Sequence, residues 1–183
     1  MRPPRGLAIR AGGIRLLIVA ASSNVLIRTA NADDDEILRT IDLATWSTSV
    51  SPAGPPSLAT SFFDSTRADE VLVAVLDGAV VGYATLGRWY DIAASAHVLE
   101  LKGLAVLPDH QRHGIGRRLV DAAIAAARRR QARRLALRVL GPNAAARTLY
   151  ESCGFQIEGI FREQFLLDGR YVDDVFMAVD LGC

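Results

Sequence analysis

Cysteine and histidine are scarce in this chain: 183 residues include 2 cysteines and 3 histidines. Cys153 and Cys183 lack the short spacing of zinc ligands, and two cysteines make no disulfide framework. The histidines are scattered and are not grouped with carboxylates. We therefore expect no bound metal, and free thiols in a reducing, cytoplasmic compartment.

An excess of charge of either sign is also missing, since 21 basic and 20 acidic side chains leave a formal net charge of +1 at pH 7. Half of the residues are hydrophobic, which is typical of a globular protein and not of a disordered or nucleic-acid-coating one. The length fits one domain with a substantial core.

Long hydrophobic runs are absent near the start, where the longest, Leu16–Ala21, is far shorter than the roughly 20 residues that span a bilayer. Arginines surround this run, so the segment has some features of a signal peptide. We expect residues 1–24 to be an N-terminal extension, disordered or arising from a misassigned start; an added strand and a targeting segment are the alternatives. The domain proper then covers residues 25–183, with no membrane attachment.

The rest of the chain alternates strand-like and helix-like patterns. In the first half, the pattern predicts a strand at 25–30, a helix after Asn31, a proline-rich loop at 51–57, and a hairpin of 70–76 and 79–86 around Asp77-Gly78. In the second half, it predicts a strand at 98–107, a helix from 115 to about 130, a strand at 135–140 and a short helix at 143–152. A closing hairpin of 156–167 and 171–181 around Asp168-Gly169 ends the domain. This order predicts an α/β fold without internal repeats.

The segment between the strand at 98–107 and the following helix has the composition of an anion site. It reads Gln111-Arg112-His113-Gly114-Ile115-Gly116. Glycines let successive backbone N–H groups converge, and a helix N-terminus adds about half a positive charge. No Lys-Ser or Lys-Thr follows the glycines and no GxGxxG is present, so a P-loop and a dinucleotide fingerprint are excluded. A diphosphate-binding loop fits better.

A second motif follows at 143–155: Asn143, Ala146, Leu149, Tyr150, Gly154 and Phe155 stand at fixed spacing. Together with Gln111, Gly114 and Gly116, this resembles the GNAT superfamily of acetyltransferases, whose loop is Gln/Arg-x-x-Gly-x-Gly/Ala and whose later signature is Asn-x-x-Ala-x-x-Leu-Tyr-x-x-x-Gly-Phe. The resemblance covers residues 25–181. It implies an acyl-CoA-dependent N-acetyltransferase, an acyltransferase that moves an acetyl group from acetyl-CoA to a primary amine by direct attack.

The resemblance also implies a fold and a donor site. The fold is a single GNAT-like α/β domain with a mixed, mostly antiparallel, twisted sheet of about six to seven strands. Helices flank both faces, and the fourth and fifth strands splay into a V. Gly103 is a candidate for a bulge in the fourth strand. The donor-binding residues would be Leu104, Ala105, Val106, Gln111, Arg112, His113, Gly114, Ile115, Gly116, Arg117, Asn143, Ala146 and Tyr150.

The acidities of the reacting groups suggest catalytic roles. A tyrosine with a pKa near 10 stays protonated at pH 7 and can protonate the leaving thiolate, so Tyr150 is the candidate general acid. Glu100 is the candidate base, because Glu100-Leu101-x-x-Leu104-Ala105-Val106 resembles a strand of the ribosomal-protein alanine acetyltransferase branch. Alternation puts Glu100 on the face of Leu104 and Val106 unless a bulge intervenes. Another group or a water remains an alternative base.

The acceptor site is less defined by the sequence. Residues 162–174 resemble the closing hairpin of phosphinothricin-type and small-amine acetyltransferases, which implies that Arg162, Asp173 or Asp174 contacts the substrate, as Glu100 would. The variable segments 45–64 and 89–96 are expected to shape the site. A small-molecule amine or a protein N-terminus is the expected acceptor, and a homodimer is left open.

A cluster of arginines at 128–134 raises nucleic acid as a partner, but arginines also suit the C-terminal end of a helix. Aromatic residues for base stacking are missing there, so we expect no nucleic acid. The alternatives to the enzyme are a catalytically silent CoA-binding regulatory module and, more weakly, an arginine-dependent nucleic-acid-binding protein.

Overall fold

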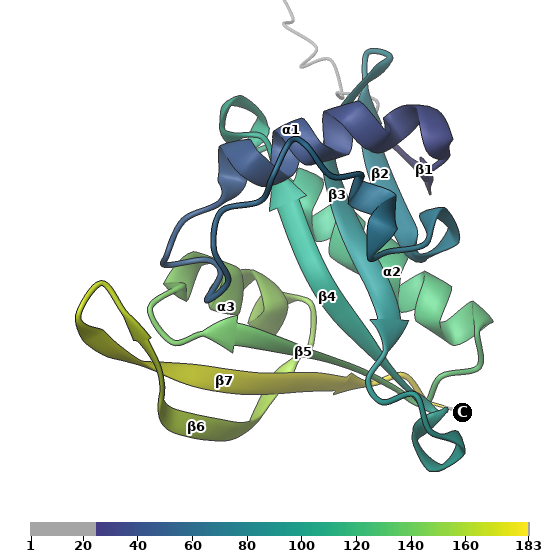
Figure 1. Ribbon diagram of the computed structural model, residues 1–183. Helices are drawn as coiled ribbons and strands as arrows, with labels where there is room; N and C mark the ends of the chain where they lie inside the picture. Colours follow the sequence, from purple (N-terminus) through teal and green to yellow (C-terminus); the bar gives the residue numbers. More distant parts are fainter. Residues whose placement is uncertain (1–24, 183) are drawn as a thin grey trace, which may run out of the picture.

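The computed structural model describes residues 25–182, and the expectations for residues 1–24 and for Cys183 lie outside this part (Figure 1). Seven strands form one sheet in the order β1-β2-β3-β4-β5-β7-β6. Their bounds are Leu26–Thr29 (β1), Val71–Leu76 (β2), Ala79–Arg88 (β3), Val98–Val106 (β4), Arg134–Leu140 (β5), Gln156–Leu167 (β6) and Arg170–Asp180 (β7). Only the β4–β5 pair in this sheet is parallel, so the predicted mixed, mostly antiparallel sheet is confirmed.

Both predicted hairpins turn where glycine was expected. Asp77 and Gly78 have φ of 50° and 85°, and Asp168 and Gly169 have φ of 48° and 74°. Positive φ at both central residues is the conformation of a type I′ turn, whose twist matches that of the flanking strands.

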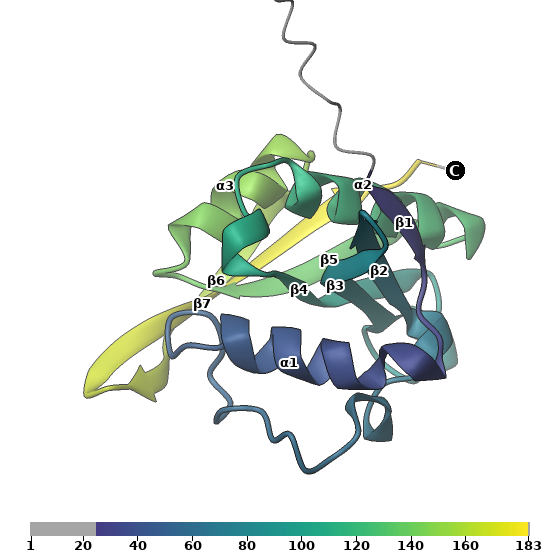
Figure 2. The same cartoon turned by 90° about the horizontal axis from the view of Figure 1, so that it is seen from above.

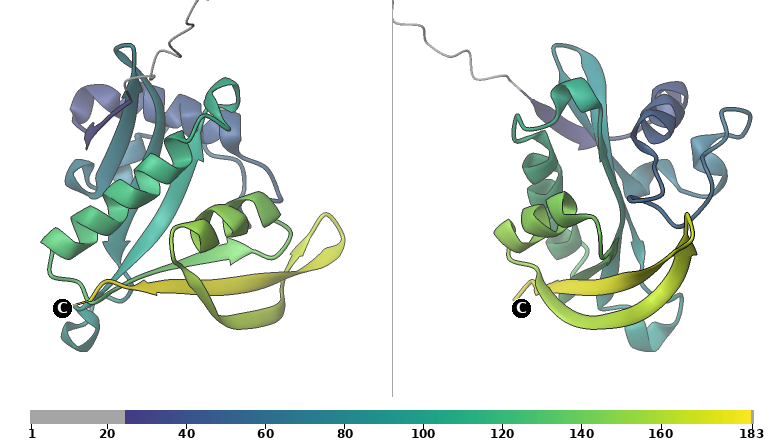
Figure 3. Two further views of the ribbon diagram at one scale, coloured as in Figure 1. Left: turned by 180° about the vertical axis from the view of Figure 1, so that it is seen from behind. Right: turned by 90° about the vertical axis from the view of Figure 1, so that its left-hand side faces the viewer.

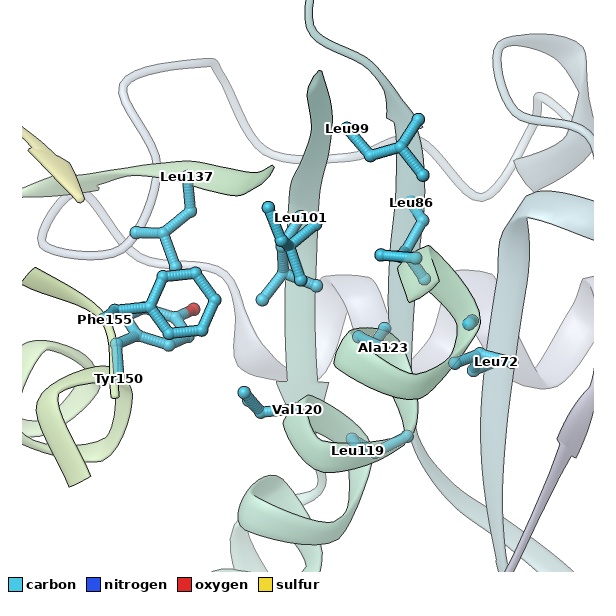
Figure 4. Close-up of a cluster of buried hydrophobic side chains, with 14 of the residues drawn as sticks. Leu72, Leu86, Leu99, Leu101, Leu119, Val120, Ala123, Leu137, Tyr150 and Phe155 are labelled. Atoms are coloured by element: carbon cyan, nitrogen blue, oxygen red, sulfur yellow. The ribbon is translucent and has the colours of Figure 1, made fainter. Parts of the chain in front are cut away.

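Helices cover both faces of the sheet, as expected (Figure 2). Helix α1 (Asp35–Thr45) lies on one face, and α2 (Ile115–Arg129) and α3 (Ala144–Ser152) lie on the other. The apolar stripe of α2 packs on the sheet with Leu119, Val120 and Ala123 fully buried (Figure 4). Within residues 25–182, no helix has both the length and the apolar character needed to cross a bilayer.

The fourth and fifth strands separate into a V. Parallel pairing covers only three positions, from Val98 opposite Arg134 to Glu100 opposite Ala136. Beyond them β4 stays paired with β3, while β5 continues along β7 (Figure 1). The β5-facing edge of β4 therefore has no strand partner after Glu100.

A β-bulge lies in β4 beside the predicted position. Thr85 of β3 is opposite Gly103 and Leu86 is opposite Leu101, so the extra residue is Lys102, one position before the glycine. A Cβ on Gly103 would lie 2.9 Å from the Thr85 hydroxyl oxygen, which explains the glycine as a point of close approach.

The bulge changes which residues share a face. Leu99 and Leu101 pack into the core under α2, and so do Leu104 and Val106, although the two pairs differ in parity. Glu100 therefore points to the α1 face, away from Leu104 and Val106. Uninterrupted alternation would have grouped these residues wrongly.

The closing hairpin curves toward the loop that follows α1 (Figure 3). At its tip, Asp168 accepts a hydrogen bond of 2.6 Å from the hydroxyl of Thr48, a residue of that loop. The hairpin and the loop thus meet on the α1 side of the sheet, over the mouth of the V.

Candidate active site

The loop before α2 presents a row of free backbone donors. No residue within 25–182 accepts a hydrogen bond from the N–H groups of residues 112–117. Arg112 has φ of 64° and Gly114 has φ of 77°, so the chain curls at both residues around His113. Such alternation makes a concave nest of N–H groups, and here it stands at a helix N-terminus. A Cβ at Gly114 would meet no atom within 4 Å, so the space beside it is open.

Strand β4 offers the second set of free backbone groups. Leu107 donates its N–H to the carbonyl oxygen of Val81 of β3 across 2.9 Å. This bond shows which residues at the end of β4 direct their backbone groups toward β3. By alternation, the N–H and C=O groups of Leu104 and Val106 turn the other way, toward the open V. The carbonyl oxygen of Val106 is taken by the side-chain amide of Gln111 at 2.9 Å. Leu104 keeps both of its groups on an edge that no strand covers.

Helix α3 lines the other arm of the V. Asn143 is its N-cap, and the side-chain oxygen accepts the N–H of Ala146 at 3.2 Å. Tyr150 is 8% exposed, packs against Phe155, and turns its hydroxyl from α3 toward β4 (Figure 4). Burial raises the pKa of Tyr150 to about 12, so the phenol is protonated throughout the physiological range.

A cavity of about 780 Å³ opens at the mouth of the V. Its walls come from α1 and the loop after it, from β3 and β4, from β5 and α3, and from the closing hairpin. Five of the predicted donor-binding residues line it: Leu104, Ala105, Asn143, Ala146 and Tyr150. Val106, at the end of β4, and residues 111–117, at the N-terminal end of α2, lie outside the lining. The segment 45–66 contributes many lining residues, and the segment 89–96 contributes none.

Glu100 lies at the vertex of the V and is partly buried. It faces Gly87 on one side and Ala136 on the other, and it is outside the cavity lining. Burial raises the pKa of Glu100, and the positive charges of Lys102 and Arg138 oppose this rise. Its carboxyl group is therefore moved toward the range where it can exchange protons near neutral pH.

The three hairpin candidates have different surroundings. Asp174 is 2% exposed, lines the cavity and is paired with Arg138. Asp173 accepts a 2.9 Å hydrogen bond from the N–H of Glu163, inside the bulge of β6. Arg162 is exposed on the same bulge and does not line the cavity. Among the three, the fold brings only Asp174 to the cavity.

Asp42 and Arg138 are two of the charged cavity residues that were not anticipated, and Arg39 and Lys102 are the others. Asp42 of α1 accepts a 2.7 Å hydrogen bond from the hydroxyl of Tyr83 on β3, and both residues line the cavity. Burial raises the pKa of Tyr83, and the neighbouring Asp42 carboxylate adds to the rise. Arg138 of β5 is the second such group. Neither stands in a short motif, and only the fold brings Asp42 to Tyr83 and Arg138 to Asp174.

Metal ligands do not gather anywhere in residues 25–182: no three His, Cys, Asp or Glu side chains stand close enough to hold an ion. Cys153 is a free thiol at the end of α3. Burial raises its pKa, so it is a poor nucleophile at neutral pH.

Comparison with known proteins gives concordant matches. The model of the Acetyltransferase (GNAT) family matches residues 36–155. An L-amino acid N-acyltransferase of Escherichia coli (strain K12) is 32% identical over 111 residues, 61% of this chain and 64% of that protein. A ribosomal protein bS18 alanine N-acetyltransferase of the same strain is 42% identical over 99 residues, 52% of this chain and 66% of that protein.

A solved structure extends the match. An acetyltransferase of Salmonella typhimurium, solved with its cofactor acetyl-CoA, is 26% identical with a TM-score of 0.76, covering 88% of this chain and 96% of that one. The sequence matches to the two curated relatives are shorter, at just under two thirds of their lengths.

Proposed function

Because the chain belongs to the GNAT family of acetyltransferases, we propose that it transfers an acetyl group from acetyl-CoA to a primary amine by direct attack. The observation that carries the proposal is the row of N–H groups at residues 112–117, free of acceptors within the described chain and next to the open edge of β4. A donor that is anionic at one end and amide-bearing in the middle complements both features.

The residues fit such a donor. The diphosphate would rest on the N–H groups of residues 112–116, and Gly114 leaves room for its oxygens. Arg117 would add positive charge, although it also pairs with Asp121 at 3.7 Å. The amides of the pantetheine arm would pair with the backbone groups of Leu104 and the N–H of Val106 as an added strand, beside Ala105, whose backbone groups face β3. Asn143, Ala146 and Tyr150 would face the arm from α3.

The acceptor must attack as a neutral amine. An α-amine with a pKa near 8 costs about 1.4 kcal/mol to deprotonate at pH 7, whereas a lysine amine near 10.4 costs about 4 to 5 kcal/mol. The reaction is therefore easier for an α-amine, whether of a small molecule or of a protein N-terminus. Glu100 is the proposed base. Because it stands outside the cavity lining, it would receive the proton through a water molecule.

Tyr150 is the proposed acid, but its burial limits how readily the phenol can give up its proton. A phenol of pKa about 12 gives up its proton to a thiolate with a conjugate acid near 8.5 only against the equilibrium. Its main contribution is then a hydrogen bond to sulfur as charge develops there. The net proton for the thiol comes from the attacking amine, whose nitrogen loses a proton as the amide forms.

Two alternatives are weaker. A silent CoA-binding module needs no acceptor cavity beside the donor edge, yet this chain has one of about 780 Å³. For nucleic acid, the arginine cluster is partly engaged within the fold: Arg128 donates to the carbonyl of Leu181 and Arg130 to that of Asp69. We propose no nucleic-acid partner.

The experiment measures release of free CoA from acetyl-CoA with a panel of amines, alongside the melting temperature with and without acetyl-CoA. We expect amine-dependent release and a rise in melting temperature. Gly114→Glu should abolish both, because it puts bulk and negative charge among the N–H groups. Gly78→Glu is the control, since Gly78 also has positive φ and open space but lies in the β2–β3 turn. Equal loss in both variants, or no release with any amine, would contradict the proposal.

A further inference from the structure

Arg138 is held at the cavity wall in a fixed orientation. Its Nε donates to the Asp174 carboxylate across 2.6 Å, and one terminal nitrogen, Nη2, bonds to the same oxygen. The guanidinium carbon lies 5.2 Å from the centroid of the Phe176 ring, directly opposite on β7. Asp174 is buried, whereas the Arg138 side chain is 44% exposed. The arginine is thus clamped from one side and open on the other.

The open side carries unused donors. A guanidinium has five N–H groups, and the Asp174 carboxylate takes one from Nε and one from Nη2. The remaining three, two on Nη1 and one on Nη2, have no acceptor within residues 25–182. They form the end-on fork that binds a carboxylate through two parallel hydrogen bonds. Both Arg138 and Asp174 line the cavity.

The charged side chains around Arg138 leave one positive charge unbalanced, which favours binding of an anion. Asp174 balances the charge of Arg138, but Lys102 also lines the cavity and forms no ion pair with any residue of 25–182. Lys102 and Arg138 belong to the two diverging strands β4 and β5, and both act electrostatically on Glu100 at the vertex between them. The negative group across the cavity is Asp42, on α1. Arg39 of α1 also lines the cavity, but it is paired with Asp35 at 2.9 Å. The positive charge without an ion-pair partner in the described chain, that of Lys102, therefore lies on the V side.

The loop after α1 forms one wall of the cavity and is joined to the closing hairpin. The loop after α1 contributes lining residues from Trp46 to Gly54, and Thr48 in this loop is bonded to Asp168 at the hairpin tip.

We infer that Arg138 binds the carboxylate of the acceptor, with Lys102 adding positive charge nearby, which makes the acceptor a free α-amino acid and not a protein N-terminus. This inference rests on the proposed function and names the substrate class of the same cavity. In an α-amino acid one carbon joins the amine and the carboxylate, so fixing the carboxylate on the V side keeps the amine near the edge where the thioester would lie. A peptide N-terminus has a neutral amide at that place and would leave the fork without its anion.

The test uses acceptors matched in everything but the carboxylate. Glycine, alanine, leucine, methionine and phenylalanine are each compared with their C-terminal amides, by CoA release at saturating acetyl-CoA. We expect the best amino acid to exceed its amide by on the order of 100-fold in kcat/KM. Equal rates for acids and amides, or a preference for amides, would overturn the inference.

Variants then assign the preference to the arginine. Arg138→Gln should lower kcat/KM for the amino acid by on the order of 100-fold, mainly through KM, and leave the amide nearly unchanged. Arg138→Lys keeps a partner for buried Asp174 and removes the fork, so it should show the same selective loss if the glutamine variant fails to fold. Lys102→Met should give a smaller selective loss. Arg133→Gln, an exposed arginine outside the cavity, is the control.

The remaining outcomes are decisive as well. If the Arg138 variants lower kcat for acids and amides alike, the arginine acts on the reaction or on the fold, and the inference is wrong. If no amine releases CoA, the proposed function fails separately, and binding is read from the melting temperature. In that case an amino acid should stabilise the unaltered chain, its amide should not, and Arg138→Lys should abolish the shift. Absence of that pattern would refute carboxylate binding on its own terms.

Discussion

Gln111 donates a hydrogen bond from its side-chain amide to the carbonyl oxygen of Val106 across 2.9 Å. The bond joins the N–H nest before α2 to the open edge of β4, which are the two surfaces proposed to hold the donor. Because Val106 has no strand partner on that side, the glutamine also satisfies a carbonyl that would otherwise be left unpaired in a partly buried place.

Gln111→Ala should loosen this connection without removing any N–H group of the nest. A hydrogen bond of this kind contributes about 1 kcal/mol, so the KM for acetyl-CoA should rise by about fivefold while kcat changes little. Steady-state kinetics with varied acetyl-CoA would measure this. Gln131→Ala, at an exposed position after α2, is the control. An unchanged KM would show that the loop holds its shape without the glutamine.

Tyr150→Phe should separate binding from chemistry. The ring and its packing on Phe155 remain, so affinity for acetyl-CoA should stay within about twofold, while kcat falls by on the order of 100-fold if the hydroxyl stabilises the departing thiolate. The raised pKa of about 12 adds a second expectation for the unaltered chain. Because Tyr150 stays protonated between about pH 8 and 10, its ionisation should not lower the rate in that range. Full activity of the phenylalanine variant would rule out the assigned role.

Much of this architecture follows from local signals in the sequence. The turns at Asp77-Gly78 and Asp168-Gly169 need positive φ, and the residues there tolerate it, so hairpin positions were predictable. The helix after Gly114 and the cap at Asn143 follow from spacing and capping chemistry. These features depend on residues close in the chain.

The parts that could not be predicted depend on residues far apart in the chain. The Asp42–Tyr83 and Arg138–Asp174 pairs each join positions more than thirty residues apart. The bulge of β4 was expected at Gly103, but its extra residue is Lys102, and Gly103 is instead a point of close approach to Thr85, which belongs to another strand. The extra residue reverses the alternation along β4, so Glu100 lies on the α1 face, which the sequence left open.

The identity of the base can be decided by comparing Glu100→Gln with Asp42→Asn. Glu100 stands at the vertex with a pKa raised by burial, so its loss should lower kcat at neutral pH by about 10- to 100-fold and remove the rise of rate with pH that its ionisation causes. Asp42→Asn should mainly change the KM of the amine. Profiles of kcat against pH would measure both effects. The reverse result would move the base to Asp42, the carboxylate that lines the cavity.

Asp34, just before α1, should make the stability of the fold depend on pH in the acidic range. Asp34 is buried, accepts the N–H of Asn31 at 2.8 Å and pairs with Arg28 at 2.7 Å. The hydrogen bond from Arg28 is the largest cause that lowers the pKa of Asp34. A lowered pKa in the folded state means that this stabilisation is fully present above the unfolded value of about 3.9 and is lost as the pH falls through the folded value.

Asp34→Asn should therefore lower the free energy of unfolding by about 2 kcal/mol at pH 7, because it removes the two charged hydrogen bonds to Arg28 while its amide oxygen can still accept the N–H of Asn31. The gap between variant and unaltered chain should narrow below about pH 4, because protonation removes the charge from the unaltered chain as well. Urea denaturation at pH 7 and at pH 3 measures it. Asp33→Asn, next in the chain and exposed, should show no such gap. A difference that stays constant between the two pH values would mean that the charge of Asp34 contributes nothing, and that only the shape of the cap matters.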